Sequence, residues 1–132
     1  MEEKQKEELK KNNPALYNVA MEGGTEAPFS GKYVKEAAAG MYTCAVCGNQ
    51  LFKSDAKFES KGSGLAGWPS FDDAIPGSVE FRPDDSLGMH RTEVVCKNCG
   101  SHLGHLFDDP SEGKTGKHFC INSVCLNLQK EK

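Results

Sequence analysis

The sequence predicts a mainly β protein with little helix. Short runs of alternating apolar and polar residues recur along the chain, and turns rich in Gly, Pro and Asp separate them. The clearest runs are residues 78–82 and 91–95, and residues 118–128 form a third β-type run that contains Phe, Ile and Val. Several short strands divided by such turns are typical of an all-β architecture.

The N-terminal end is the part of the chain where we expect a helix. Residues 2–11 are rich in helix formers, and Leu9 is their only strongly apolar residue. An Asn-Asn-Pro sequence then supplies a stop. We therefore interpret residues 1–14 as a polar arm or a surface helix.

The next segment leads into the first pair of cysteines. Turn residues are dense between positions 15 and 31, which favours irregular backbone over a strand. Residues 32–39 are compatible with a short helix that ends at Gly40. Residues 41–43 are then predicted to form a short strand.

Size and charge argue against several classes of protein. The 132 residues fit one domain, residues 1–132, and no apolar run approaches the length of a membrane span. The polar N-terminus has no secretory signal pattern, so we expect a cytoplasmic protein, and we expect a monomer. Because the net charge is −3 and the lysines are scattered, nucleic acid is not an expected partner.

Two copies of a C-x-x-C-G pattern predict a structural metal site. Cys44 and Cys47 form the first pair, and Cys96 and Cys99 form the second. Four thiolates make a closed tetrahedral shell, which is typical of one structural Zn²⁺ rather than of a catalytic metal. The long spacing between the pairs predicts that the metal joins two separate hairpins. Redox-active dithiols, plain core cysteines, and iron in the same shell are the alternatives.

Cys120 is a thiol with no evident partner among the other cysteines. Alternate residues of a strand share a face, so His118, Cys120 and Asn122 are expected to point the same way. Polar groups then flank the sulfur, as they do around an activated nucleophile. The alternative is a small, buried, apolar cysteine, and the residues alone favour it.

Two histidines lie close to Cys120 in sequence. His102 and His105 can converge on its sulfur, with Asp108 or Asp109 available to orient an imidazole. Ordinary hydrogen bonds of these histidines remain the alternative.

Trp68, the only tryptophan, lies in a glycine-rich segment from residue 60 to residue 71. Such a segment predicts a flexible or tightly turned loop. A rigid aromatic ring on such a loop suits a ligand pocket. The other interpretation is a ring that fills the core, and the residues alone favour the core.

Five further motifs occur in a fixed order around these residues. They are G-T-E-A-P-F-S-G at 24–31, G-W-P-S-F at 67–71, G-M-H-R-T-E-V at 88–94, H-L-G-H-L-F-D-D at 102–109 and C-I-N-S at 120–123. With the two cysteine pairs, they make residues 17–128 resemble the B-type methionine sulfoxide reductases, which reduce the R epimer of methionine S-oxide. Several motifs in one order are far more specific than any single one.

The resemblance implies a fold and a set of site residues. The fold is two antiparallel β-sheets, a tent-like barrel, with short N-terminal helices and a structural zinc. The implied site residues are Cys120 as the nucleophile, His102, His105 and Asn122 around the sulfoxide oxygen, Asp109 as an orienting carboxylate, and Trp68, His118 and Phe119 at the substrate.

The implied activity is thiol-dependent reduction of methionine-R-sulfoxide, free or in oxidised proteins, which repairs oxidative damage. A thiolate can attack the sulfoxide sulfur if the oxygen is hydrogen-bonded or protonated as it leaves, and His and Asn are suitable donors. A sulfenic acid then remains on Cys120, and thioredoxin or a small thiol must reduce it. The alternative function is a zinc-stabilised β binding module that keeps the fold without catalysis.

The recycling step is where the sequence departs from the family. Many members have a resolving cysteine directly before G-W-P-S-F, but this chain has Ala66 there, with extra residues at 61–65. Cys125 is the only spare thiol. In a continuous strand it lies roughly 16 Å from Cys120 and on the opposite face. We therefore expect Cys125 to be a core residue and an external thiol to recycle Cys120.

The second departure is His118, at a position where the family typically has arginine. Arginine is permanently cationic and lowers the pKa of a neighbouring thiol, whereas histidine is charged only at lower pH. We therefore expect a weaker or more pH-dependent thiolate at Cys120.

Overall fold

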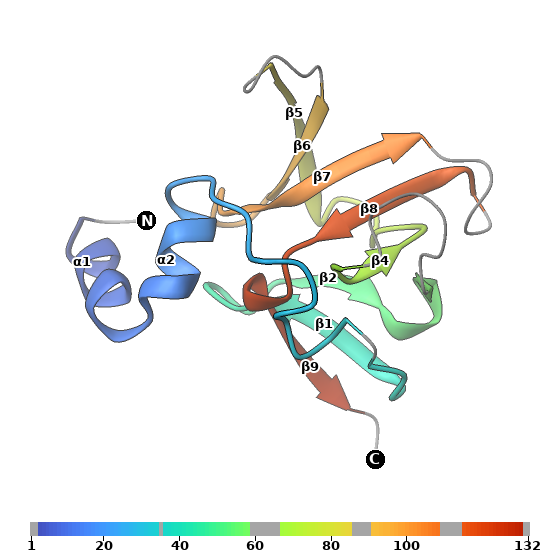
Figure 1. Ribbon diagram of the computed structural model, residues 1–132, viewed down its shortest axis with the longest axis horizontal. Coiled ribbons are helices and arrows are strands. Elements are labelled where there is room, and N and C mark those ends of the chain that lie inside the picture. Colours follow the sequence, from blue (N-terminus) through green and yellow to red (C-terminus); the bar gives the residue numbers. More distant parts are fainter. Residues whose placement is uncertain (1–2, 35, 59–66, 86–90, 109–114, 131–132) are drawn as a thin grey trace.

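Two antiparallel β-sheets and two short N-terminal helices make up the fold (Figure 1). The structure, a computed structural model, describes residues 3–34, 36–58, 67–85, 91–108 and 115–130. The predicted mainly β architecture with short N-terminal helices is therefore confirmed.

The elements are short and follow one another along the chain. In chain order they are α1 (Glu3–Asn12), α2 (Pro14–Ala20), β1 (Gly40–Cys44), β2 (Gln50–Lys53), η1 (Ser54–Ala56), β3 (Lys57–Phe58), β4 (Ser70–Phe71), β5 (Val79–Asp84), β6 (Arg91–Cys96), β7 (His102–Asp108), β8 (Lys117–Ile121), η3 (Ser123–Cys125) and β9 (Leu126–Lys130).

The two sheets differ in size, and the chain crosses between them twice. A three-stranded sheet has the order β2-β1-β9, and a six-stranded sheet has the order β3-β4-β8-β7-β6-β5. After β2 the chain enters the large sheet, and the single turn of η3 returns it to β9 in the small one. The run of residues 118–128 is therefore two strands in different sheets, and its prediction as one continuous strand was wrong.

Helix α2 occupies a segment that we expected from the sequence to be irregular backbone. The Asn-Asn-Pro sequence ends α1 but also begins α2, because the Asn13 side chain accepts a hydrogen bond from Leu16 N at 3.2 Å and Pro14 occupies the first helical position. The helix then buries Leu16, Val19 and Ala20. The helix expected over residues 32–39 is absent from the described part of that segment, 32–34 and 36–39. None of the described helices is long and apolar enough to cross a membrane.

An aromatic cluster fills the space between the sheets. Tyr42 and Phe52 come from the small sheet, and Phe71 and Phe119 come from the large one; none of the four is more than 2% exposed. The rings of Phe52 and Phe71 stack at 4.4 Å, and the ring of Phe119 lies edge-on to Phe52 at 5.7 Å. Burial of these rings is a large part of the apolar area removed from water on folding.

Candidate active site and metal site

Two tight turns carry the four paired cysteines. The β1–β2 turn holds Cys44 and Cys47, and the β6–β7 turn holds Cys96 and Cys99. In each turn a glycine with positive φ, 82° at Gly48 in the first, closes a hydrogen bond back to the carbonyl of the first cysteine. The two turns belong to different sheets, which agrees with the prediction that the cysteines join two hairpins.

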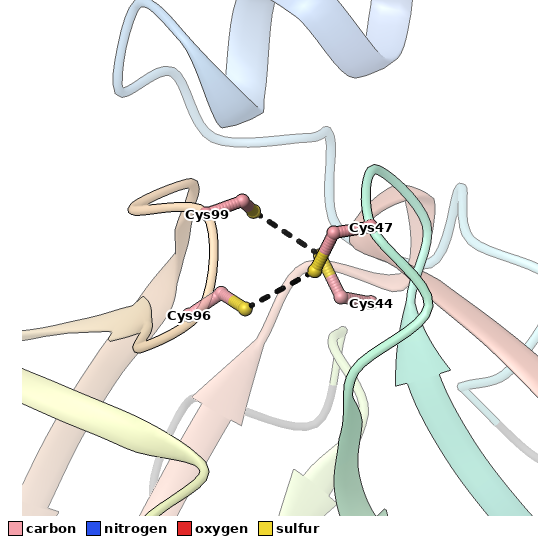
Figure 2. Close-up of side chains that lie close together, drawn as sticks. All are labelled: Cys44, Cys47, Cys96 and Cys99. Atoms are coloured by element: carbon pink, nitrogen blue, oxygen red, sulfur yellow. Dashed lines mark hydrogen bonds between the residues drawn. The ribbon is translucent and has the colours of Figure 1, made fainter. Parts of the chain in front are cut away.

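The four sulfur atoms meet in one cluster (Figure 2). All of them lie within 4.8 Å of one another, with Cys44 Sγ 3.7 Å from Cys99 Sγ and Cys47 Sγ 3.6 Å from Cys96 Sγ. Hydrogen bonds within the cluster lower the pKa of Cys96 and raise the pKa of Cys44, because protonated neighbours stabilise a single thiolate. A metal ion would favour the thiolate at all four positions. The cysteines are thus positioned to bind one metal ion.

Cys120 lies in the middle of the large sheet, on β8 between β4 and β7. Its cross-strand neighbours are Ser70 on β4 and His105 on β7, and Glu93 on β6 lies opposite His105. Residues paired in this way share a face of an antiparallel sheet. Ser70, Cys120, His105 and Glu93 therefore form one row across the sheet.

A β-bulge brings the two histidines together. His102 and His105 are three residues apart on β7, and in a regular strand that spacing points side chains to opposite faces. The β6–β7 register shifts between Val94 and Val95, where β7 contains one extra residue. As a result the two imidazole rings lie on the same face, with centroids 5.4 Å apart.

Each imidazole is oriented by a carboxylate from a neighbouring strand. His102 Nδ1 donates to Glu93 Oε2 at 2.6 Å, and His105 Nε2 donates to Asp84 Oδ2 at 2.7 Å. Arg91 Nη2 lies 3.6 Å from the same oxygen of Asp84. His102 Nε2 is buried and, among the described residues, has no hydrogen-bond partner. His102 is not among the residues that line the cavity at Cys120.

A cavity of about 80 Å³ opens at Cys120. Gly104 makes this close packing possible, since a Cβ there would overlap the carbonyl oxygen of Cys120. The cavity combines a thiol, hydrogen-bonding groups and two aromatic side chains. Its lining residues are Thr25, Trp68, Arg91, Gly104, His105, Phe107, Cys120 and Asn122.

Trp68 and Asn122 face this cavity from different segments. Trp68 is partly exposed, and its Nε1 donates to the carbonyl oxygen of Glu26 at 2.9 Å. The expectation that Trp68 fills the core, which the residues alone favoured, was wrong. Asn122 Oδ1 accepts from Glu26 N at 3.0 Å, and Asn122 Nδ2 donates to the carbonyl oxygen of Leu103 at 3.0 Å. Both side chains are thereby held by the backbone.

Burial sets the charge states of the thiol and of His105. Burial, and then the negative charge of Glu26, raises the pKa of Cys120 to about 12. Burial also lowers the pKa of His105 below its usual value, against the opposing effect of its hydrogen bond to Asp84. At neutral pH the site therefore contains a protonated thiol and an uncharged imidazole.

Two of the residues expected at the substrate, His118 and Phe119, lie away from the cavity. His118 is fully buried, where its Nε2 lies 2.7 Å from Ser70 Oγ and its ring packs 4.9 Å from that of Phe58. Phe119 belongs to the aromatic core. Neither residue lines the cavity. Asp109 lies outside the described residues.

Cys125 is a buried residue of η3. Its side chain is part of the hydrophobic core, and its thiol donates to the carbonyl oxygen of His102 at 3.3 Å. Burial raises the pKa of this thiol above its usual value. Because the chain turns at η3, the separation of Cys120 and Cys125 that was derived for a continuous strand does not apply.

Several residues of the site were not assigned from the sequence. Glu26 and the pair Arg91 and Glu93 stand in the quoted motifs G-T-E-A-P-F-S-G and G-M-H-R-T-E-V, so the motifs contained a signal. Asp84 had none. It is placed by the β5–β6 register, which pairs it with Arg91.

Comparison with known proteins places the chain in a family. The SelR domain matches residues 13–130. The peptide methionine sulfoxide reductase MsrB of Methanosarcina barkeri (strain Fusaro / DSM 804) is 51% identical over 131 residues, which cover 98% of this chain and 89% of that protein. The corresponding MsrB of Leifsonia xyli subsp. xyli is 47% identical over 119 residues, covering 89% of this chain and 83% of that protein.

A relative from an animal is equally similar. Methionine-R-sulfoxide reductase B3, mitochondrial, of Mus musculus is 49% identical over 125 residues, which cover 94% of this chain and 47% of that protein. The resemblance that the motifs indicated is therefore confirmed: the chain belongs to the SelR domain family and is similar over most of its length to proteins named MsrB or methionine-R-sulfoxide reductase B.

Proposed function

We propose that the chain is a peptide-methionine (R)-S-oxide reductase that converts methionine-R-sulfoxide to methionine and so repairs oxidative damage. Membership of the SelR domain family supports the reaction. The single observation that supports Cys120 as its nucleophile is the cavity in which this thiol lies beside His105, Trp68 and Asn122.

The cavity offers a place for each part of a sulfoxide group. Trp68 and Phe107 supply aromatic surface for the methyl group. Asn122 Nδ2 has a second hydrogen beyond the one given to Leu103, and it can donate this hydrogen to the sulfoxide oxygen. His105 completes the polar side, and the ring of His102 lies behind it at 5.4 Å between centroids.

The chemical step transfers one oxygen atom. The Cys120 sulfur attacks the sulfoxide sulfur and forms an S–S bond, and the protonated oxygen then moves to the Cys120 sulfur as its bond to the substrate sulfur breaks. Cleavage of the S–S bond releases methionine and leaves a sulfenic acid on Cys120. Thiol plus sulfoxide gives sulfenic acid plus thioether, so the thiol hydrogen ends on the transferred oxygen. Uncharged His105 can accept that proton and pass it on, because its Nε2 donates to Asp84 and its other ring nitrogen is then an acceptor.

An external thiol completes the cycle. The first equivalent forms a mixed disulfide with Cys120 and releases water, and the second returns the free thiol. Cys125 is buried in the core, which supports thioredoxin or a small thiol in the cytoplasm as the reductant. The contributions of Asp109, His118 and Phe119 remain predictions.

We further propose that the four paired cysteines hold one structural Zn²⁺. With a Zn–S distance of about 2.3 Å, a tetrahedral shell has sulfur atoms about 3.8 Å apart. The observed separations of 3.7 and 3.6 Å fit that shell. The ion would fix two hairpins from different sheets and leave no position for substrate.

Epimer selectivity tests the proposed reaction directly. Dithiothreitol-dependent reduction of dabsylated methionine sulfoxide should occur with the R epimer alone. The Cys120→Ser variant should lose at least about a thousandfold in rate, because the nucleophile is removed. Cys125→Ser, measured beside it, should retain activity within a few fold. If folded, zinc-loaded protein reduces neither epimer, the chain is a binding module.

Zinc content tests the metal site. The purified protein should contain one zinc per chain, and Cys99→Ala should bind less than a tenth of that. Loss of the ion should lower the free energy of unfolding by at least about 3 kcal/mol, less than the ~10–16 kcal/mol that zinc supplies to finger peptides, since this protein also has a core. Cys120→Ser is the control and should keep its zinc. A metal-free wild type of equal stability would contradict the site.

The rate of thiol alkylation tests the charge state of Cys120. With a pKa of about 12, the thiolate is a minor species at pH 7 and its population increases as pH rises toward that value. The iodoacetamide rate at Cys120, followed by peptide mass spectrometry, should therefore increase about tenfold per pH unit from 7 to 10. A rate that levels off below pH 9 would show that the thiol is not held protonated.

A further inference from the structure

Glu26 makes long-range contacts to the turn that follows β8. Its Oε2 accepts a hydrogen bond from Ser123 N at 2.7 Å, and its Oε1 accepts one from Val124 N at 2.9 Å. These are charge-assisted bonds to the first peptide groups of η3, almost a hundred residues away in sequence. The carboxylate therefore fastens its own segment to the point where the chain leaves the large sheet.

The main chain of Glu26 holds two side chains of the cavity. Its N–H donates to Asn122 Oδ1 at 3.0 Å, and its carbonyl oxygen accepts from Trp68 Nε1 at 2.9 Å. The first bond fixes which end of the Asn122 amide is the donor to the cavity side, because the oxygen is already occupied. The second fixes the indole ring. Glu26 itself does not line the cavity.

The sequence leaves room for this carboxylate. A Cβ at Gly31 would overlap Ser123 Cβ and would lie 2.8 Å from Glu26 Oε2. Only a glycine at that position lets the segment close over Glu26 while its carboxylate bonds to η3. The hydrogen bonds between Glu26 and η3 thus depend on Gly31 as well as on the carboxylate.

We propose that Glu26 is a positioning residue for the reduction. Its carboxylate, bonded to η3, holds its own peptide groups in place, and these peptide groups fix Trp68 and Asn122 at the cavity. Precise placement of site residues by a supporting shell is what a rate-enhancing geometry requires. The role rests on the proposed reductase function. The negative charge of Glu26, which contributes to the raised pKa of Cys120, acts on the same site.

The Glu26→Ala variant tests this role. If the variant only reduced the fraction of folded enzyme, the apparent kcat would fall and KM would stay the same. If Trp68 is displaced, the substrate also loses an aromatic contact and KM rises. We expect kcat/KM for the R epimer to fall at least about tenfold with a higher KM. The emission of Trp68, the only tryptophan, should also change as its Nε1 loses its partner. Glu22→Ala, which removes an exposed glutamate from the same segment, should match the wild type.

Two further variants keep the test decisive. Gly31→Ala displaces the carboxylate without removing its charge, and it should reproduce the higher KM and the altered emission. Glu26→Gln retains one acceptor and the size of the side chain, so it should fold if Glu26→Ala does not, with an intermediate loss of activity. Wild-type KM and wild-type emission in folded Glu26→Ala, or in Glu26→Gln if alanine is not tolerated, would overturn the proposal.

The outcomes separate this role from the reaction itself. An inactive wild type would mean that the reductase function is wrong. In that case the emission of Trp68 would still show whether Glu26 positions it, because fluorescence needs no turnover.

Discussion

The four sulfur atoms at the end of the β1–β2 and β6–β7 hairpins are the contact on which the arrangement of the two sheets depends. Cys44 and Cys47 come from the small sheet, and Cys96 and Cys99 come from the large one. Asn49 Nδ2, from the first turn, also approaches Cys96 Sγ at 3.7 Å. A metal ion in this cluster would set how the sheets meet, and β7 begins only three residues after the last of these cysteines.

The site is built from two irregularities next to that contact. The bulge in β7 turns His102 and His105 to one face. The η3 turn ends β8 directly after Cys120 and Ile121, and so leaves Asn122 free to reach Leu103. A regular sheet would separate these side chains, because alternation sends every second residue to the opposite face. The regular strands form the framework of the site, and the β7 bulge and the η3 turn bring its polar side chains together.

Much of the fold followed from the sequence because local signals and tertiary structure agree. Alternation located β5 and β6, and the two C-x-x-C-G turns indicated the metal cluster. The position of helix α2 was missed because Asn13 and Pro14 both end one helix and begin the next. The break between β8 and β9 was missed because apolar residues continue through it.

The cavity was harder to predict because its contacts are long-range. The Glu26 carboxylate accepts hydrogen bonds from Ser123 and Val124, which are 97 and 98 residues away in sequence. Asp84 reaches His105 only through strand register. No local pattern encodes such contacts. The role of Trp68 was likewise undecided by composition, since an indole suits both a core and a pocket. The resemblance carried by the motifs implied a role for Trp68 at the substrate, which the periodicity of apolar residues did not.

A single turnover without added thiol tests the central claim most directly. Zinc-loaded protein is mixed with one equivalent of methionine-R-sulfoxide in the presence of dimedone, and its peptides are analysed by mass spectrometry. We expect one methionine to form per chain, together with one dimedone adduct on the peptide that contains Cys120. Methionine formed with the adduct on another cysteine, or with Cys120 joined to Cys125 in a disulfide, would contradict it.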